Sequence, residues 1–180
     1  MLRAALFAAV AVGSLIVWLR SSEPMSEWPK VLTFSATLCG LAFALPTYAR
    51  LVGGRTVFRV SLVSAAGALL GSVSNVMEDG LQLEWAFWLF ILSLAIIDFG
   101  LFAFTIVVAF IGRGPRRLLA AVPAATLAGV LLFPVGGFVL MLAAWIAAAA
   151  LALRWPAHSG APADGRGPED PPLEAAGTVS

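Results

Sequence analysis

Asp98 is the residue whose type and position in this chain could most directly do chemistry. It lies in the middle of an apolar stretch, residues 85–111. If that stretch crosses a bilayer, Asp98 lies near the midplane, where an aspartate costs roughly 2.5–3.5 kcal/mol on insertion scales. We therefore expect its side chain to face the interior of a helix bundle, where burial favours the neutral acid. It would then bind a proton or cation in a transport site, or hydrogen-bond a neighbouring helix and help assembly only.

Two sets of polar residues are candidate companions of Asp98. Thr105 follows two turns later on the same helical face. A second set recurs at helical spacing along residues 57–77 and comprises Ser61, Ser64, Ala68, Ser72 and Asn75. The same stretch contains a GxxxG pattern at Gly67 and Gly71. Small residues and hydroxyls at this spacing are typical of a helix-packing face. The alternative is a polar track that ends at Asn75 and faces Asp98.

An acidic cluster follows this stretch. It consists of Glu78, Asp79 and Glu84, together with the amide of Gln82. Oxygen atoms at this density could hold a divalent cation or meet a cationic head group. The segment is too short and too sparsely patterned for a calcium-binding motif, and a solvated acidic loop is the alternative.

Most residue types on which enzymes depend are missing from the apolar part of the chain. His158 is the only histidine and Lys30 the only lysine, so a histidine triad, an HExxH motif, haem ligation within the membrane and a Walker A motif are excluded. An intramembrane aspartyl protease would need two aspartates, and the apolar stretches contain one. We predict no catalytic residue, no cofactor and no metal site. An enzyme acting at the outer face through Glu78 and Asp79 ranks last.

The composition indicates a membrane protein. Of the 180 residues, 61% are hydrophobic and 12% are charged, against about 25% charged in soluble domains. One globular core could not bury so much apolar surface, so lipid must solvate most of the chain. The single cysteine, Cys39, excludes an intrachain disulfide and is expected to be a small buried apolar residue.

Five apolar stretches must position these side chains: residues 4–19, 31–48, 57–77, 85–111 and 118–153. A helix needs about 20 apolar residues to cross a bilayer. The last stretch would be about 54 Å long as one helix, far more than a hydrocarbon thickness of about 30 Å. Pro134 and the Gly136–Gly137 pair interrupt it, which favours two short spans joined by a tight turn, with a re-entrant segment as the alternative.

The fold class predicted is therefore an all-α integral membrane protein. Residues 1–155 form a bundle of six transmembrane helices, or of five plus a re-entrant segment. Residues 156–180 are rich in Pro, Gly, Ala and acidic residues and form a disordered cytoplasmic tail.

The basic residues set the orientation. With six spans, nine of the eleven basic residues fall on one side: Arg3, Arg50, Arg55, Arg59, Arg113, Arg116, Arg117, Arg154 and Arg166. Only Arg20 and Lys30 fall on the other. Cytoplasmic loops are enriched in Lys and Arg, so both termini are predicted to be cytoplasmic. Four tryptophans would line the outer interface, and two aromatic residues the inner one: Trp18, Trp28, Trp85 and Trp88 outside, Tyr48 and Trp155 inside.

The preference for Arg over Lys, in a chain rich in Ala, Gly and Val, is typical of high-GC bacteria. A multi-pass protein of the bacterial inner membrane is therefore expected. Its partners would be the lipid bilayer and another membrane protein or a second copy, with no role for nucleic acid. Cytoplasmic arginines such as Arg50 and Arg55 could bind anionic lipid head groups, although the orientation by itself accounts for them.

Three functions follow, in order of preference. The first is a structural, accessory or partner-binding role, as an oligomer packed through residues 57–77. The second is a small proton- or cation-coupled transporter that uses Asp98. The third is the membrane enzyme at the outer face.

Overall fold

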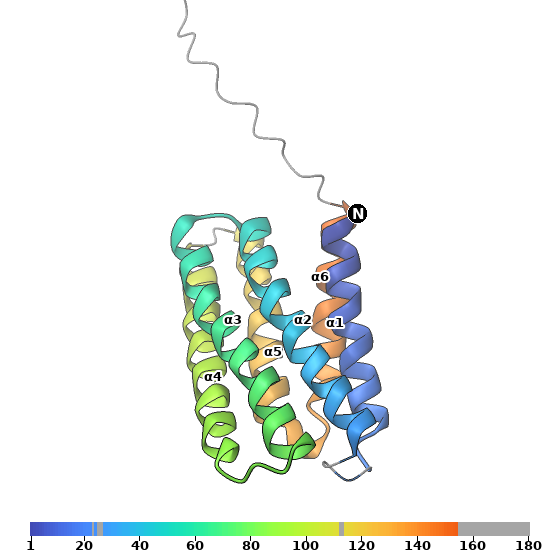
Figure 1. Cartoon of the computed structure of the whole chain (residues 1–180). Helices are drawn as coiled ribbons and strands as arrows, with labels where there is room; N and C mark the ends of the chain where they lie inside the picture. The colour runs from blue at the N-terminus through green and yellow to red at the C-terminus, as the bar shows by residue number, and fades with distance from the viewer. Residues whose placement is uncertain (23, 25–26, 112–113, 155–180) are drawn as a thin grey trace, which may run out of the picture.

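The computed structural model describes residues 1–22, 24, 27–111 and 114–154, and within them it consists of helices joined by short turns, with no strand (Figure 1). Six α-helices form the bundle: α1 Leu2–Leu19, α2 Trp28–Val52, α3 Arg55–Asn75, α4 Ala86–Ile111, α5 Ala121–Leu131 and α6 Phe138–Arg154. Three short elements join them: the π-helix η1 Val76–Gly80 and the 3-10 helices η2 Gly114–Ala120 and η3 Phe133–Val135. The prediction of an all-helical protein is confirmed for these residues. The tail predicted at 156–180 lies outside them.

Four of the helices are long and apolar enough to cross a membrane. They are α1, α2, α4 and the segment Arg55–Gly80 that comprises α3 and η1. The remaining two apolar helical segments are shorter, Arg117–Leu131 and Phe138–Arg154. A tight turn joins these two segments, and Gly136 takes a left-handed conformation there with φ +92°. The expectation that residues 118–153 form two helices and a turn is confirmed.

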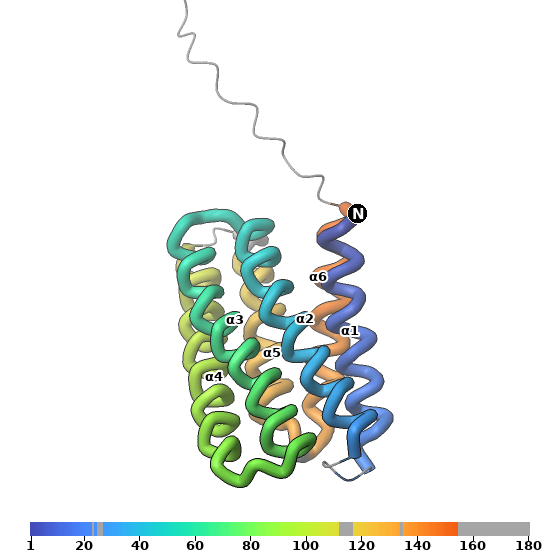
Figure 2. The backbone as a smooth tube through the Cα atoms, viewed as in Figure 1, coloured from blue at the N-terminus to red at the C-terminus, as the bar shows by residue number. Residues whose placement is uncertain are grey.

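Successive helices alternate in direction, so the bundle has two distinct ends (Figures 1 and 2). The start of α1, the α2–α3 turn, η2 and the end of α6 lie at one end. We call it the arginine end, after Arg3, Arg50, Arg55, Arg59, Arg117 and Arg154. The other three connections lie at the opposite end, which carries Trp18, Trp28, Trp85 and Trp88. We call it the tryptophan end, and it also carries Arg20 and Lys30.

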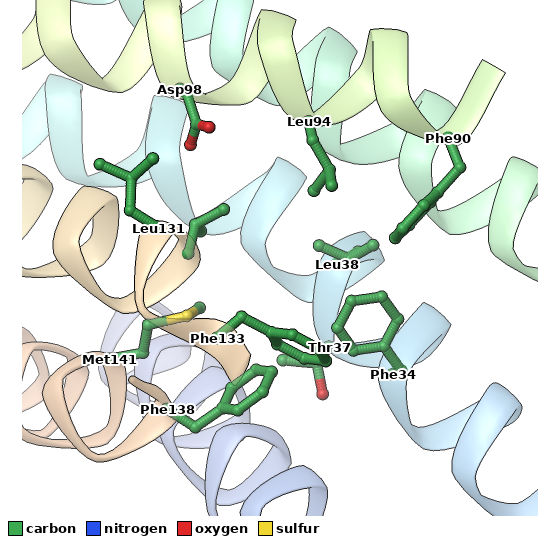
Figure 3. A pocket seen from close by; sticks show the side chains of 11 residues that line it. Phe34, Thr37, Leu38, Phe90, Leu94, Asp98, Leu131, Phe133, Phe138 and Met141 are labelled. Atoms are coloured by element: carbon green, nitrogen blue, oxygen red, sulfur yellow. The ribbon is translucent and has the colours of Figure 1, made fainter. Parts of the chain in front are cut away.

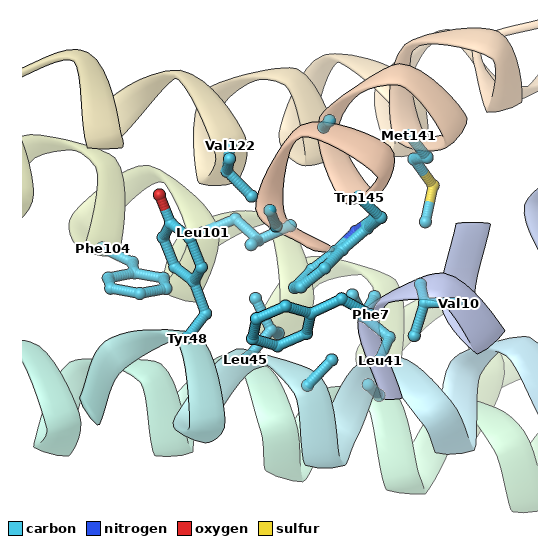
Figure 4. Close-up of a cluster of buried hydrophobic side chains, with 14 of the residues drawn as sticks. Phe7, Val10, Leu41, Leu45, Tyr48, Leu101, Phe104, Val122, Met141 and Trp145 are labelled. Carbon is cyan, nitrogen blue, oxygen red and sulfur yellow. The ribbon is translucent and has the colours of Figure 1, made fainter. Parts of the chain in front are cut away.

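The helices pack in an order that brings both halves of the chain together. Helix α3 lies between α2 and α4, while α1 packs against α2 and α6, and α5 packs against α4 and α6. The largest buried side chains meet where these helices converge (Figure 4). The Phe7 ring of α1 lies 5.4 Å from the Trp145 ring of α6 and 6.1 Å from the Tyr48 ring of α2. This aromatic cluster joins the first two helices to the last one.

Tyr48 departs from its predicted place at a membrane interface. Its side chain is completely buried, and its hydroxyl donates a hydrogen bond to the carbonyl oxygen of Leu119 in η2. The hydroxyl is satisfied inside the protein because η2 folds over this end of α2. The prediction for Tyr48 was therefore wrong.

The small-residue face of α3 packs within the chain, against α4. A Cβ atom built on Gly67 would lie 2.8 Å from the Ile97 nitrogen, and one on Gly100 would lie 2.7 Å from the Ser64 nitrogen. These helices approach so closely because neither glycine has a side chain. The helix-packing interpretation is confirmed. An oligomer would have to use another surface, because this face is already occupied.

Candidate functional site

A cavity of about 300 Å³ lies between α2, α4, α5, η3 and α6 (Figure 3). Most of its wall is apolar. The aromatic residues are Phe34, Phe90, Phe133 and Phe138, and the aliphatic residues are Leu38, Leu94, Val130, Leu131 and Met141. The polar lining residues that the structure describes are Asp98 and Thr37. The cavity is therefore suited to an apolar body that carries few polar groups.

Asp98 is the charged group of this cavity. Its side chain leaves α4 and points into the cavity, toward Leu131 and Met141 in the view of Figure 3. The Oδ1 atom is buried and makes no hydrogen bond to the part of the chain that the structure describes. A buried polar atom without a partner is costly, so such an atom in a native protein points to a ligand, a proton or a bound water as its partner.

Thr37 contributes less hydrogen-bonding capacity than its position suggests. Its hydroxyl donates a hydrogen bond of 2.7 Å to the Thr33 carbonyl oxygen, one turn earlier in α2. The donor is thus used by the helix itself, and only the acceptor lone pairs remain for a ligand. Asp98 is the stronger polar anchor of the cavity.

Four phenylalanines surround the cavity at the side nearer the tryptophan end. They come from α2, α4, η3 and α6, and their rings touch edge to face: Phe133–Phe138 at 4.7 Å, Phe34–Phe133 at 5.4 Å, Phe34–Phe90 at 6.1 Å and Phe34–Phe138 at 6.2 Å. The electron-rich face of an aromatic ring attracts a cation as well as an apolar group. The cavity thus combines aromatic walls at one side with a carboxyl group midway along α4.

The predicted companions of Asp98 do not join it at the cavity. The Asn75 side chain faces α2, where Nδ2 donates to Ser35 Oγ at 2.9 Å and to the Val31 carbonyl oxygen at 3.3 Å. Thr105 donates to the Leu101 carbonyl oxygen of its own helix at 2.8 Å. The polar face of α3 packs against α2 and α4 and supplies no lining residue that the structure describes. The proposed track from Asn75 to Asp98 is therefore wrong.

Glu78 and Asp79 lie in η1 at the tryptophan end, apart from the cavity. The amide of Gln82 donates to the Asp79 carbonyl oxygen. Lys30 of α2 is buried, donates to the Ser21 carbonyl oxygen at 3.3 Å and acts with its positive charge on the Asp79 carboxylate. Across the described residues, no group of three or more His, Cys, Asp or Glu side chains could hold a metal ion. These contacts connect Asp79 to α2 at the tryptophan end, and the Glu78 side chain makes no hydrogen bond to another helix within the described residues.

Sequence reasoning missed Thr37 and all four phenylalanines of the cavity. The sequence carries no signal for these residues, because Thr37 and the phenylalanines lie in separate apolar stretches and nothing in their spacing pairs residues from four elements. No protein-family model matches the chain, and neither a curated protein nor a solved structure matches it. Its function must be argued from its own side chains.

Proposed function

We propose that this chain is a polytopic protein of the cell membrane that crosses the bilayer six times, with both termini in the cytoplasm. Three large aromatic side chains of α4 support a lipid environment, because Trp88, Phe99 and Phe110 are 72%, 72% and 83% exposed. The arginine end would face the cytoplasm and the tryptophan end the outer interface, as the distribution of basic and aromatic residues in membrane proteins favours.

The number of crossings depends on two short helical segments, Arg117–Leu131 and Phe138–Arg154. At about 1.5 Å per residue they reach roughly 22 Å and 26 Å, less than a hydrocarbon thickness of about 30 Å. A bilayer accommodates such a mismatch by local thinning. A C-terminal fusion to green fluorescent protein is expected to fluoresce, because that protein folds in the cytoplasm. Activity of a C-terminal alkaline phosphatase fusion instead would place the end of the chain outside and leave five crossings.

Within this fold, we propose that the cavity at Asp98 binds a small molecule with an apolar body and one cationic, hydrogen-bond-donating group. The buried Asp98 Oδ1, which has no hydrogen-bond partner among the described residues, carries this proposal because it lies in an apolar cavity. An ionised carboxylate in such surroundings is stabilised by an opposite charge at hydrogen-bond distance. The phenylalanine rings offer faces for the apolar body and for the cation.

This chemistry corresponds to a proton-coupled carrier. A carboxyl group near the bilayer midplane can hold a proton or pair with a cation, and the two exclude each other because each uses the same negative charge. Release of the cation would then favour protonation of Asp98, and arrival of the cation would favour release of the proton. Movement of the two in opposite directions would be coupled in this way.

Binding of benzylamine to the purified full-length protein tests the site. We expect saturable binding of benzylamine, little binding of the uncharged benzyl alcohol, and loss of benzylamine binding in Asp98→Asn. Thr105→Val is the matched control, since Thr105 lies on the same helix but does not line the cavity. Benzylamine binding that is equal in the native protein and in Asp98→Asn would refute a site at this carboxyl group.

A carrier also has to move the cation. In proteoliposomes with an acidic lumen, external benzylamine should remove protons from the lumen faster when the vesicles contain the native protein than when they contain Asp98→Asn or no protein, since those two report the passive entry of uncharged benzylamine. Saturable benzylamine binding without faster loss of protons from the lumen would mean that the protein binds the cation but does not transport it.

A partner-binding, accessory role is the second candidate, and the exposed aromatic face of α4 favours it. The same side chains that could contact lipid could pack against a helix of another membrane protein. In that case Asp98→Asn would restore a deletion strain as well as the native gene, whereas Phe99→Ala with Phe110→Ala would not.

A further inference from the structure

A second pocket, of about 430 Å³, lies at the arginine end, where α2 turns into α3. Its lining residues are Arg50, Gly53, Gly54, Arg55, Phe58 and Arg59. Three exposed arginines thus line one pocket at this turn of the chain. We call it the arginine pocket.

The backbone of this turn depends on its two glycines. Gly53 and Gly54 have φ angles of +92° and +93°, which residues other than glycine rarely adopt. Gly54 is the N-cap of α3 and no side chain caps this helix end. The first N–H groups of α3 therefore point toward the turn with the positive end of the helix dipole behind them.

The contacts and charges around the pocket favour an anion. The Arg50 guanidinium lies 4.8 Å from the centre of the Phe58 ring, so this cation is stacked on an aromatic face. Arg55 and Arg59 are four residues apart on one helical face, where like charges repel each other. The first turn of α3 contains no acidic residue. In the described residues, the carboxylates lie at the tryptophan end or at Asp98, so none offsets this repulsion.

We propose that the arginine pocket binds a phosphate group. Guanidinium groups hydrogen-bond phosphate oxygens through two parallel N–H groups, and helix N-termini bind the same anion through backbone N–H groups. The phosphate belongs either to the head group of an anionic phospholipid or to a free phosphate ion. An orientation signal alone requires positive charges near the cytoplasmic face. It does not require three arginines, a stacked ring and an uncapped helix end at one pocket.

The full-length protein in a neutral detergent provides the test, with bound lipids counted by native mass spectrometry. We expect tighter binding of phosphatidylglycerol than of phosphatidylcholine, whose ammonium group the arginines repel. The double variant R55Q/R59Q should weaken phosphatidylglycerol binding roughly tenfold. Its matched control is R3Q/R154Q, which removes the same charge at the same end of the bundle outside the pocket and should bind as the native protein does.

A single substitution provides a second test in case the double variant fails to fold. R50Q leaves α3 unchanged and should weaken phosphatidylglycerol binding in the same direction. R154Q is its control, because Arg50 and Arg154 each lie in the last turn of their helix. Equal losses in the pocket variants and their controls, or equal affinity of the native protein for the two lipids together with no effect of inorganic phosphate, would overturn the proposal.

Inorganic phosphate distinguishes the two sources of the anion. If the source is a phospholipid, phosphate should not displace phosphatidylglycerol and should not raise the unfolding temperature. If the source is free phosphate, it should do both in the native protein and neither in R55Q/R59Q.

Discussion

The hydroxyl of Tyr48 donates a hydrogen bond of 2.7 Å to the carbonyl oxygen of Leu119, across 71 residues of sequence. This bond ties the end of α2 to η2, and η2 leads directly into α5. The α5–α6 pair supplies Leu131 and Met141 to the cavity. The bond therefore joins α2 to the segment that leads into α5, and both helices line the cavity.

Replacement of Tyr48 by phenylalanine should destabilise the protein. The aromatic packing would remain, but the buried Leu119 carbonyl would lose its donor, at a cost of about 1–3 kcal/mol. Thermal unfolding in detergent measures the effect. Thr47→Val is the control, because the Thr47 hydroxyl donates an exposed hydrogen bond to the Phe43 carbonyl of its own helix. An unchanged unfolding temperature for Tyr48→Phe would mean that the bond contributes nothing to stability.

Alanine at Gly67 should disrupt the contact between α3 and α4. The added Cβ would lie 2.8 Å from a backbone nitrogen of Ile97, which cannot yield as a flexible side chain can. Overpacking of this kind costs typically about 1–3 kcal/mol. Gly40→Ala is the control, since its nearest neighbour would be a Val10 methyl group at 3.3 Å. Chemical unfolding of both variants should separate them, and equal stabilities would contradict the close approach of the two helices.

Phenylalanine at Leu94 should fill the cavity. The larger ring would occupy volume beside Asp98 without changing the carboxyl group, so benzylamine binding should weaken while the fold is retained. Leu92→Phe adds the same ring to the exposed face of α4 and should bind benzylamine normally. Comparable binding by the two variants would place the ligand somewhere else.

The pair Asn75 and Ser35 should matter for stability and not for ligand binding. Their side chains are bonded at 2.9 Å between α3 and α2, so a double-mutant cycle of Asn75→Ala and Ser35→Ala should give a coupling of about 0.5–1.5 kcal/mol. Benzylamine binding should persist in both single variants, because neither residue lines the cavity. Loss of binding in Asn75→Ala alone would return Asn75 to the candidate site.

Local features of the chain were predictable because they depend on the solvation of single segments. Apolar stretches bounded by charge indicated the helices, and Pro134 with its neighbouring glycines indicated the turn between α5 and α6. The inward orientation of Asp98 followed from the cost of a carboxyl group in hydrocarbon. Each of these inferences compares a residue with its surroundings in sequence or with the solvent, and none requires a neighbouring helix to be known.

The composition of the candidate site depended on which helices are neighbours. Thr105 shares a helical face with Asp98 by spacing, yet it does not line the cavity, whereas Thr37 of α2 does. Asn75 hydrogen-bonds Ser35 of α2. Tyr48 is buried because η2 covers it and accepts a hydrogen bond from its hydroxyl.

The amino-acid sequence by itself determined the helices, the two chemically different ends of the bundle and the one carboxyl group within it. Only the tertiary structure decided that this group shares a cavity with Thr37 of α2 and with phenylalanines from four elements. The physical reason is that charge and hydropathy act on each segment separately. The order in which six apolar helices pack is selected by many small contacts between side chains that are far apart in the chain.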